Sequence, residues 1–252
     1  MKGLFLALQF LTVFPIKKDL GLTRSTLGAS MTYFPVVGAL QGIVLVLVDM
    51  ALGSTGLLPE SVTSGILILV LALTNGGLHL DGFADTVDGL AGGKDPEGRL
   101  RIMRDSSVGA VGAVFLMLIL LLKYLAIQEL PPEIRRQALF LFPAIGRWAM
   151  VPMAALAPYA RREGGVGEAF ASNSKGVLIK STVIIAVLLA LNLGLLSLVL
   201  LIGLGAVIYG FTAFFKKRLG GVTGDVFGFQ SEAAEVIFLI MALALTNILA
   251  VD

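Results

Sequence analysis

Three aspartates, Asp81, Asp85 and Asp88, have a type and a spacing that suit chemistry. In a helix, which turns about 100° per residue, they fall within roughly a 60° arc of one surface, and His79 projects from roughly the opposite side. Like charges on one face repel one another unless a cation joins them, and Mg²⁺ prefers carboxylate oxygens. The spacing therefore fits a metal site, and on its own it fits a solvated acidic helix face equally well.

These aspartates belong to a polar segment, residues 81–107, which lies between two long apolar runs. The stretch Asn75-Gly76-Gly77 just before it interrupts the first run, and unwound backbone at membrane depth is tolerated where it lines a cavity or lies buried in protein. The glycines and the position beside a membrane favour a site over a solvated face. The other charged residues of the segment are Lys94, Asp95, Glu97, Arg99, Arg101, Arg104 and Asp105.

The composition indicates an all-α membrane protein. Of the 252 residues, 57% are hydrophobic and only 14% are charged, and the mean hydropathy is +0.93. The net charge of +2 and the lack of a basic stripe with interleaved aromatic residues argue against nucleic-acid binding. Without cysteine there is no thiolate nucleophile, and a single histidine argues against a histidine-rich metal centre.

Apolar runs long enough to cross a bilayer predict about seven spanning helices in a single integral membrane domain, residues 1–252. The stretch Met1–Ile16 is short for a span, and we interpret it as a retained interfacial or re-entrant helix. The expected spans are approximately Met31–Leu52, Val62–Leu80, Val108–Ile127, Ile134–Leu156, two within Val177–Phe215 that fold back near Asn192-Leu193-Gly194, and Glu235–Val251.

Most of the 19 lysines and arginines fall in loops on the side of residues 81–107, and this bias marks the cytoplasmic face. Arg135 and Arg136, at the start of the fourth span, are exceptions. The same orientation places the glycine-rich stretch Gly220–Gln230 on the cytoplasmic face, as a loop before the last span. Such backbone can approach anions closely, and Asp225 within it becomes a further acidic group on the same face.

Arg147 lies in the middle of the fourth span, where an unpaired charge is costly. Two interpretations are open for it: a structural pair with a buried carboxylate, or contact with a substrate phosphate. Asp49, near the opposite end of the first span, is better explained by a structural role at the membrane interface.

The segment Gly77–Gly89 (GLHLDGFADTVDG), followed by Ile102–Gly109 (IMRDSSVG), resembles the signature of the cobalamin synthase family, the adenosylcobinamide-GDP ribazoletransferases. The resemblance continues at Phe10–Pro15, Phe34–Gly38 and Gly220–Asp225, so it spans nearly the whole chain. Glu235 stands where the family carries an acidic residue. Ser107 is a departure, because the family more often has arginine there.

The resemblance implies a Mg²⁺-dependent transferase that joins adenosylcobinamide-GDP to α-ribazole, or to α-ribazole 5′-phosphate, and releases GMP. Such a displacement requires a metal on the pyrophosphate oxygens and a base beside the attacking hydroxyl. The expected metal ligands are Asp81, Asp85 and Asp88, joined by Asp105 and Asp225, and one of these carboxylates or Glu235 would be the base. Guanidinium groups match phosphate oxygens, and the candidates for holding phosphate are Arg101, Arg104, Arg147, Arg161 and Arg162.

Other interpretations fit less well. Asp85-Thr86-Val87-Asp88-Gly89 matches the start of the metal motif of CDP-alcohol phosphotransferases, but the Ala-Arg and the later aspartate pair of that motif are absent. A secondary transporter would place its carboxylates near the bilayer midplane and would often show repeats, and a structural subunit would need no clustered acids. The expected setting is the lipid bilayer of a bacterial or archaeal cytoplasmic membrane, with the active site facing the cytoplasm. A homo-oligomer, or association with other cobalamin-assembly enzymes, is left open.

Overall fold

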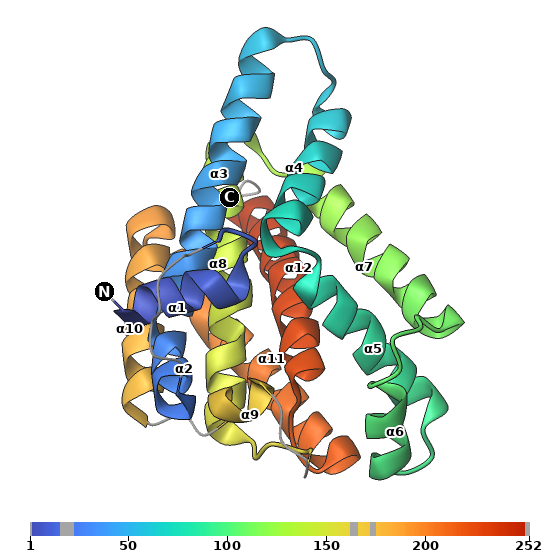
Figure 1. The fold of residues 1–252 in the computed structure, drawn as a ribbon. Coiled ribbons are helices and arrows are strands. Elements are labelled where there is room, and N and C mark those ends of the chain that lie inside the picture. Colours follow the sequence, from blue (N-terminus) through green and yellow to red (C-terminus); the bar gives the residue numbers. More distant parts are fainter. Residues whose placement is uncertain (1, 16–22, 162–165, 172–174, 250–252) are drawn as a thin grey trace.

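A computed structural model describes residues 2–15, 23–161, 166–171 and 175–249, and within these ranges the chain is helical, without any strand. One isolated bridge joins Tyr159 to Val222. Figure 1 shows the helices, which are α1 (Lys2–Leu11), α2 (Arg24–Ser30), the 3₁₀ turn η1 (Met31–Tyr33), α3 (Phe34–Thr55), α4 (Glu60–Asn75), α5 (Leu78–Gly92), α6 (Pro96–Ile102), α7 (Ala110–Gln128), α8 (Pro132–Leu156), α9 (Val166–Phe170), α10 (Lys175–Leu193), α11 (Leu196–Leu219) and α12 (Gly224–Leu249).

Six of these helical segments are long and apolar enough to cross a membrane, and the bent pair α4 and α5 raises the number to seven if it counts as one span. The two helices meet at an angle of 91°. Gly76 and Gly77 form the break with φ of 63° and 72°, a left-handed conformation that glycine adopts without strain. The expected multi-pass helical membrane protein is confirmed, as is the fold back between α10 and α11 at Gly194, whose φ is 55°.

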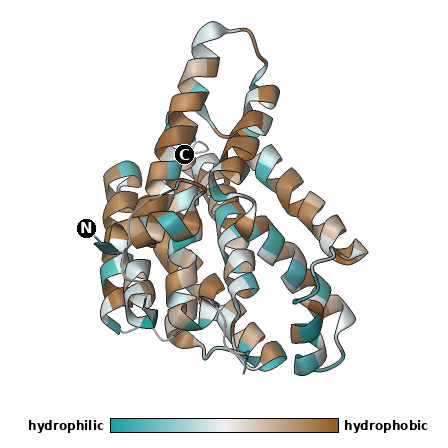
Figure 2. Cartoon of the chain, viewed as in Figure 1, coloured by the Kyte–Doolittle hydropathy of each residue, from teal (hydrophilic) through white to brown (hydrophobic). Residues whose placement is uncertain are grey.

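The centre of the bundle is formed by α8 and α12, which lie side by side in Figure 1. In the most apolar part of α8 and of α12, 78% and 72% of the residues are buried, whereas the share is 33% or lower in the other four spans. The outer helices therefore expose large apolar side chains such as Leu47 and Met117. In water such surfaces would mark binding sites or aggregation, and here they face lipid. Figure 2 shows the contrast between the hydrophobic α3 and α7 and the hydrophilic residues along α5 and α6.

Glycines let the central helices approach closely. A Cβ atom on Gly38 or Gly42 of α3 would lie 2.3 or 2.1 Å from the backbone oxygen of Pro143 or Phe140 in α8. Because the hydrophobic effect does not drive helices together in lipid, close packing at small residues becomes the main source of association. Glycines also allow the close approach of α5 and α12 where these helices cross.

The last span begins earlier than the sequence indicates, so the prediction of a loop over Gly220–Gln230 holds for residues 220–223 and is wrong from Gly224 onward. Helix α12 starts at Gly224, and the Thr223 hydroxyl accepts a hydrogen bond from the Val226 amide at 3.2 Å. A threonine cap with an acidic residue in the first turn is a favourable helix start. The glycines of this stretch suggested a loop, but Gly228 lies inside the helix because α5 packs against it.

One of the two exceptions in the charge distribution, Arg135, has a structural explanation. Arg135 forms ion pairs with Asp49 at 2.9 Å and with Glu60 at 2.7 Å. Both carboxylates stand at the same end of the bundle as Arg135, so its charge is balanced within the protein. The expected structural role of Asp49 agrees with this pair. Lys17 and Lys18, two of the basic residues on the predicted cytoplasmic side, lie outside the described residues.

Candidate active site

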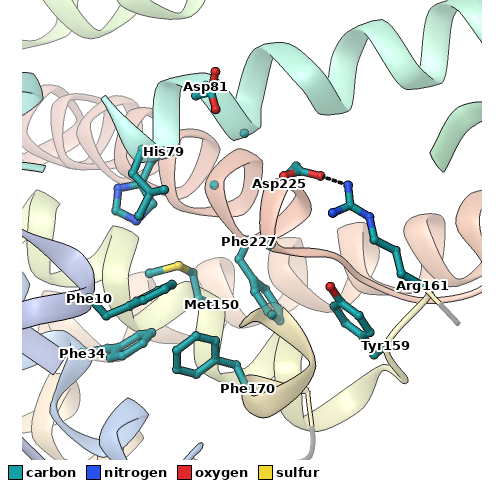
Figure 3. A pocket seen from close by; sticks show the side chains of 15 residues that line it. Phe10, Phe34, His79, Asp81, Met150, Tyr159, Arg161, Phe170, Asp225 and Phe227 are labelled. Carbon is teal, nitrogen blue, oxygen red and sulfur yellow. Dashed lines mark hydrogen bonds and ion pairs between the residues drawn. The ribbon is translucent and has the colours of Figure 1, made fainter. Parts of the chain in front are cut away.

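A cavity of about 340 Å³ lies beside the break between α4 and α5, where α5 faces α1, α8 and the start of α12. Figure 3 shows that its lining has two chemically different parts. The polar part comes from α5, α12 and the segment after α8, and it consists of Asp81, Arg161, Tyr159 and Asp225, while His79 of α5 lies beside the apolar part. The apolar part consists of Phe10, Phe34, Met150, Phe170 and Phe227.

The crossing of α5 and α12 brings acidic residues from distant parts of the chain together. A Cβ atom on Gly82 would lie 2.8 Å from the Asp225 carbonyl oxygen, and one on Gly228 would lie 2.9 Å from the His79 carbonyl oxygen. These two glycines let the backbones nearly touch. As a result Asp81 of α5 and Asp225 of α12 line the same cavity.

Asp88 has a different environment from the other aspartates of α5. Its two carboxylate oxygens accept hydrogen bonds from the amides of Gly109 and Gly112, each at 2.7 Å. These amides belong to the first turn of α7, where a negative charge is favoured by unpaired N–H groups and by the helix dipole. Asp88 therefore caps α7 and ties α5 to it, and both of its oxygens are engaged in doing so.

Asp225 is held by polar neighbours at the mouth of the cavity. Arg161 donates to its carboxylate at 2.5 Å, and the Thr223 hydroxyl donates to the same oxygen at 3.2 Å. The position of Arg161 follows from a pair of backbone hydrogen bonds just before it. The Val222 amide donates to the Pro158 carbonyl and the Ala160 amide donates to the Val222 carbonyl, both at 2.9 Å.

Tyr159, which the isolated bridge joins to Val222, contributes its ring to the cavity wall. Partial burial raises the pKa of the Tyr159 hydroxyl above its usual value, and Arg161 works in the opposite direction. The hydroxyl is therefore protonated at neutral pH and available as a hydrogen-bond donor beside the arginine.

The carboxylates of Asp81 and Asp85 form no hydrogen bond or ion pair with any described residue, although the Asp81 backbone amide donates to the Gly77 carbonyl at 2.9 Å. Asp85 lies within electrostatic range of Asp81, Asp225 and Asp88. The structure thus gathers four of the predicted carboxylates around one helix crossing, and two of them are without a partner in the described part of the chain.

These carboxylates match Mg²⁺ in the type of donor, since a hard divalent cation takes oxygen ligands. Among the described residues, however, no group of three or more acidic or histidine side chains stands at ligand spacing. Asp88 is engaged by α7 and Asp225 by Arg161, which leaves Asp81 and Asp85 as the most available donors. The five-carboxylate set expected from the sequence is not assembled in this structure.

Asp105 lies apart from the cavity, exposed in the loop between α6 and α7. It accepts hydrogen bonds from the Ser107 amide at 3.0 Å and from the Ser107 hydroxyl at 2.5 Å. These bonds lower the pKa of the Asp105 carboxyl below its ordinary value. The residue at position 107 is thus used to shape this loop.

The predicted phosphate-binding arginines are distributed unevenly. Arg161 faces the cavity. Arg101, in α6, and Arg104, just after it, are exposed. The α6 segment is anchored nearby, because Arg161 also approaches the Met103 carbonyl at 3.5 Å. Arg162 lies outside the described residues.

Arg147 and Glu235 belong to a buried ionic network rather than to the cavity lining. Arg147 donates to Glu235 at 2.6 Å and to the Ser231 hydroxyl at 2.8 Å. Lys123 of α7 contacts Glu235 at 2.6 Å and also pairs with Glu232. All four charged side chains are at most 2% exposed. The structural interpretation of Arg147 fits this arrangement.

Sequence reasoning missed Lys123, Glu232 and the aromatic part of the cavity. A single lysine in the apolar run of α7 was the available signal for the network, because a charge inside a span needs a partner. Phe10 and Phe34 each begin a stretch that resembles the family, but nothing joined them to Phe170 as one site, since phenylalanine is common in membrane helices and the three lie far apart in sequence.

The family model described as Cobalamin-5-phosphate synthase matches residues 3–243. The chain belongs to the cobalamin-5-phosphate synthase family. A relative named adenosylcobinamide-GDP ribazoletransferase from Desulforamulus reducens is 39% identical over 242 residues, which cover 95% of this chain and 96% of the relative. Relatives of the same name from Geotalea daltonii and Syntrophobacter fumaroxidans are 38% and 36% identical, over 96% and 92% of this chain and 96% and 94% of theirs. No solved structure matches the chain.

The cavity is lined by residues from parts of the sequence that resemble the cobalamin-5-phosphate synthase family. The sequence resembles the family in five stretches that are far apart along the chain, and all of them except Ile102–Gly109 contribute to the cavity wall. Phe10, Phe34, Asp81 and Asp225 represent these four in turn. Carboxylates, an arginine and an apolar wall then meet in one enclosed volume, which is an arrangement that can hold a phosphate ester beside an attacking hydroxyl.

Proposed function

We propose that this protein joins adenosylcobinamide-GDP to α-ribazole, or to α-ribazole 5′-phosphate, in a Mg²⁺-dependent reaction that releases GMP. The observation that carries the proposal is the family match along nearly the whole chain, together with full-length relatives named for this transferase. The cavity supports it independently, because phosphoryl transfer relies on positioning and charge stabilisation, and the cavity supplies groups for both.

In the proposed reaction a ribose hydroxyl of α-ribazole attacks the phosphorus that carries cobinamide. A new P–O bond forms, the bridging P–O bond breaks, and GMP leaves with that oxygen. Since the 5′-phosphate is an alternative substrate, the attacking hydroxyl is not the one at the 5′ position. The hydroxyl proton passes to a carboxylate, and Asp81, Asp85 and Asp225 are the candidates because they lie at the cavity or beside it.

Arg161 is our first choice for contact with the pyrophosphate. Its guanidinium already binds an oxyanion, the carboxylate of Asp225, and its side chain is only partly buried, so a phosphate group can reach it. A guanidinium fork matches phosphate oxygens in two parallel hydrogen bonds. Arg101 and Arg104 stand further out and fit the steering of a polyanionic substrate toward the cavity mouth.

Asp81, Asp85 and Asp225 are the residues that would hold Mg²⁺. The ion would neutralise charge on the pyrophosphate and stabilise the leaving GMP. We place this site at the cytoplasmic face of the cytoplasmic membrane, on the basis of the distribution of basic residues.

The test is release of GMP by the purified protein in detergent or nanodiscs. Both substrates are supplied, and GMP is measured by chromatography with Mg²⁺ and with excess chelator. We expect GMP to form only when both substrates and the metal are present. Absence of GMP from a folded preparation supplied with all components would refute the proposed function.

A further inference from the structure

The apolar end of the cavity is built by rings from three separate elements. Phe10 of α1, Phe34 of α3 and Phe170 of α9 contact one another, with ring centroids 4.6 Å apart for Phe10 and Phe170 and 5.7 Å apart for Phe34 and Phe170. Met150 and Phe227 extend the same surface. Aromatic rings in such a cluster offer faces and edges to another flat ring.

One polar side chain at this end has no partner. The His79 side chain is 2% exposed, and neither of its ring nitrogens has a hydrogen-bond partner among the described residues. Figure 3 shows the imidazole at the same side of the cavity as Phe10 and Met150. Buried polar groups are nearly always hydrogen-bonded, so the lone histidine indicates a ligand with a matching polar atom.

We propose that Phe10, Phe34 and Phe170 bind the aromatic base of the ribazole nucleoside, and that His79 donates a hydrogen bond to the free ring nitrogen of that base. The inference rests on the proposed function and assigns one of its two substrates to a subsite. With the base at the apolar end, the ribose hydroxyls face the end of the cavity that holds Asp81 and Asp225.

Size favours the nucleoside over the corrinoid. Cavities that bury drug-sized ligands run from about 300 to 1,000 Å³, and the volume of about 340 Å³ is at the lower end of that range. A nucleoside fits such a volume, whereas a corrin ring with its adenosyl group is several times larger. The cobinamide part of the other substrate must therefore remain outside the cavity, with its pyrophosphate reaching the mouth.

Polarity favours the ribazole base over the guanine of the GDP moiety. The dimethylbenzimidazole base carries two methyl groups and only one free ring nitrogen, which matches phenylalanine walls and a single histidine. Guanine carries several donors and acceptors around its edge. Most of them would be buried without partners at this end of the cavity, and unpaired groups of this kind allow a site to reject a ligand strongly.

The experiment measures α-ribazole binding and turnover separately. The variants are Phe170→Leu and His79→Leu, with His79→Gln to restore a donor and Phe115→Leu as the control. Phe115 is a half-exposed phenylalanine of α7 that does not line the cavity. Binding of α-ribazole without the second substrate is followed by calorimetry, and the KM of each substrate is taken from GMP release.

We expect Phe170→Leu and His79→Leu to weaken α-ribazole binding, and to raise its KM, by roughly ten-fold or more, while the KM for adenosylcobinamide-GDP stays unchanged. His79→Gln should recover part of the loss, and Phe115→Leu should match the parent. The α-ribazole analogue without the two methyl groups should bind the parent more weakly than α-ribazole does. Its affinity should also fall less than that of α-ribazole when Phe170 is replaced by leucine.

The outcomes separate the two proposals. Unchanged α-ribazole binding in the variants, or a rise confined to the KM for adenosylcobinamide-GDP, would overturn the subsite even if GMP forms normally. A parent protein that does not bind α-ribazole would overturn it as well. Binding that depends on His79 and Phe170 without any release of GMP would support the subsite and reject the proposed reaction.

Discussion

Asp81, Asp85 and Asp88, which helical periodicity predicts on one helix face, have different environments in the folded protein. Periodicity correctly places Asp81, Asp85 and Asp88 along one helix, with His79 buried on another side. It could not distinguish their partners, because the amides that donate to Asp88 belong to Gly109 and Gly112 at the start of α7, 21 and 24 residues beyond it. Helical geometry is local information, whereas a cap contributed by another helix depends on tertiary packing.

This difference leads to a prediction for the three asparagine variants. Asp81→Asn and Asp85→Asn should retain the stability of the parent and lose most activity, because the structure gives those carboxylates no structural partner in its described part. Asp88→Asn should lower the free energy of unfolding by about 1–2 kcal/mol, since one of the two cap hydrogen bonds is lost. Thermal unfolding and GMP release on the same preparations provide the comparison. If Asp88→Asn were as stable as the parent and Asp81→Asn were strongly destabilised, the division of roles would be wrong.

At the scale of elements, hydropathy was a good guide to most spans and a poor one to the start of α12. The apolar runs located α3, α7, α8, α10 and α11 closely, because burial in lipid depends on the side chains of the segment itself. The stretch after Gly220 reads as a loop because glycine has low helix propensity. Its helix is stabilised by packing against α5 at Gly228, which a single sequence does not reveal.

The crossing of α5 and α12 should be intolerant of even one added methyl group. A Cβ atom at Gly82 would lie 2.8 Å from backbone atoms of Asp225 that have no freedom to rotate away. We expect Gly82→Ala to separate the two helices, to cost about 1–3 kcal/mol of stability and to remove most GMP release. Gly205→Ala is the matched control: nothing lies within 4 Å of its added Cβ, and alanine favours the helix. Equal activity and equal melting temperature for both variants would show that the crossing does not position the site.

At the scale of the whole molecule, a buried ionic network joins α7, α8 and α12. It contains two cations, Lys123 and Arg147, and two anions, Glu232 and Glu235, so its formal charge is zero. Removing one member leaves an uncompensated buried charge, which costs about 3–5 kcal/mol. Lys123→Met should therefore destabilise the protein strongly, and the double variant Lys123→Met/Glu232→Met should recover much of the loss by restoring neutrality. Unfolding curves in detergent test this, and a double variant less stable than the single would contradict the charge-balance argument.

Membrane orientation is the remaining property of the whole molecule that sequence and structure predict together. The pairs of Arg135 with Asp49 and Glu60 account for one of the two exceptions, whereas Arg136 still counts against the assignment, and the bias of the other basic loops predicts one cytoplasmic face. The chain has no cysteine, and single cysteines introduced at Lys94, Lys217 and Ser54 can be labelled without background. These exposed positions avoid Gly220, where a side chain would be strained at a φ of 80°, and Gly93, where an added Cβ would lie 2.4 Å from the Arg99 side chain. We expect an impermeant maleimide to reach positions 94 and 217 from the cytoplasmic side and position 54 from the opposite side.

Positions 94 and 217 must share a face whichever way the protein is oriented, because Arg99 of α6 donates to the Arg218 carbonyl of α11 at 2.9 Å. Labelling of these two from opposite faces would contradict the packing of α6 on α11. Labelling of both from outside would leave the fold intact and would reject a cytoplasmic active site.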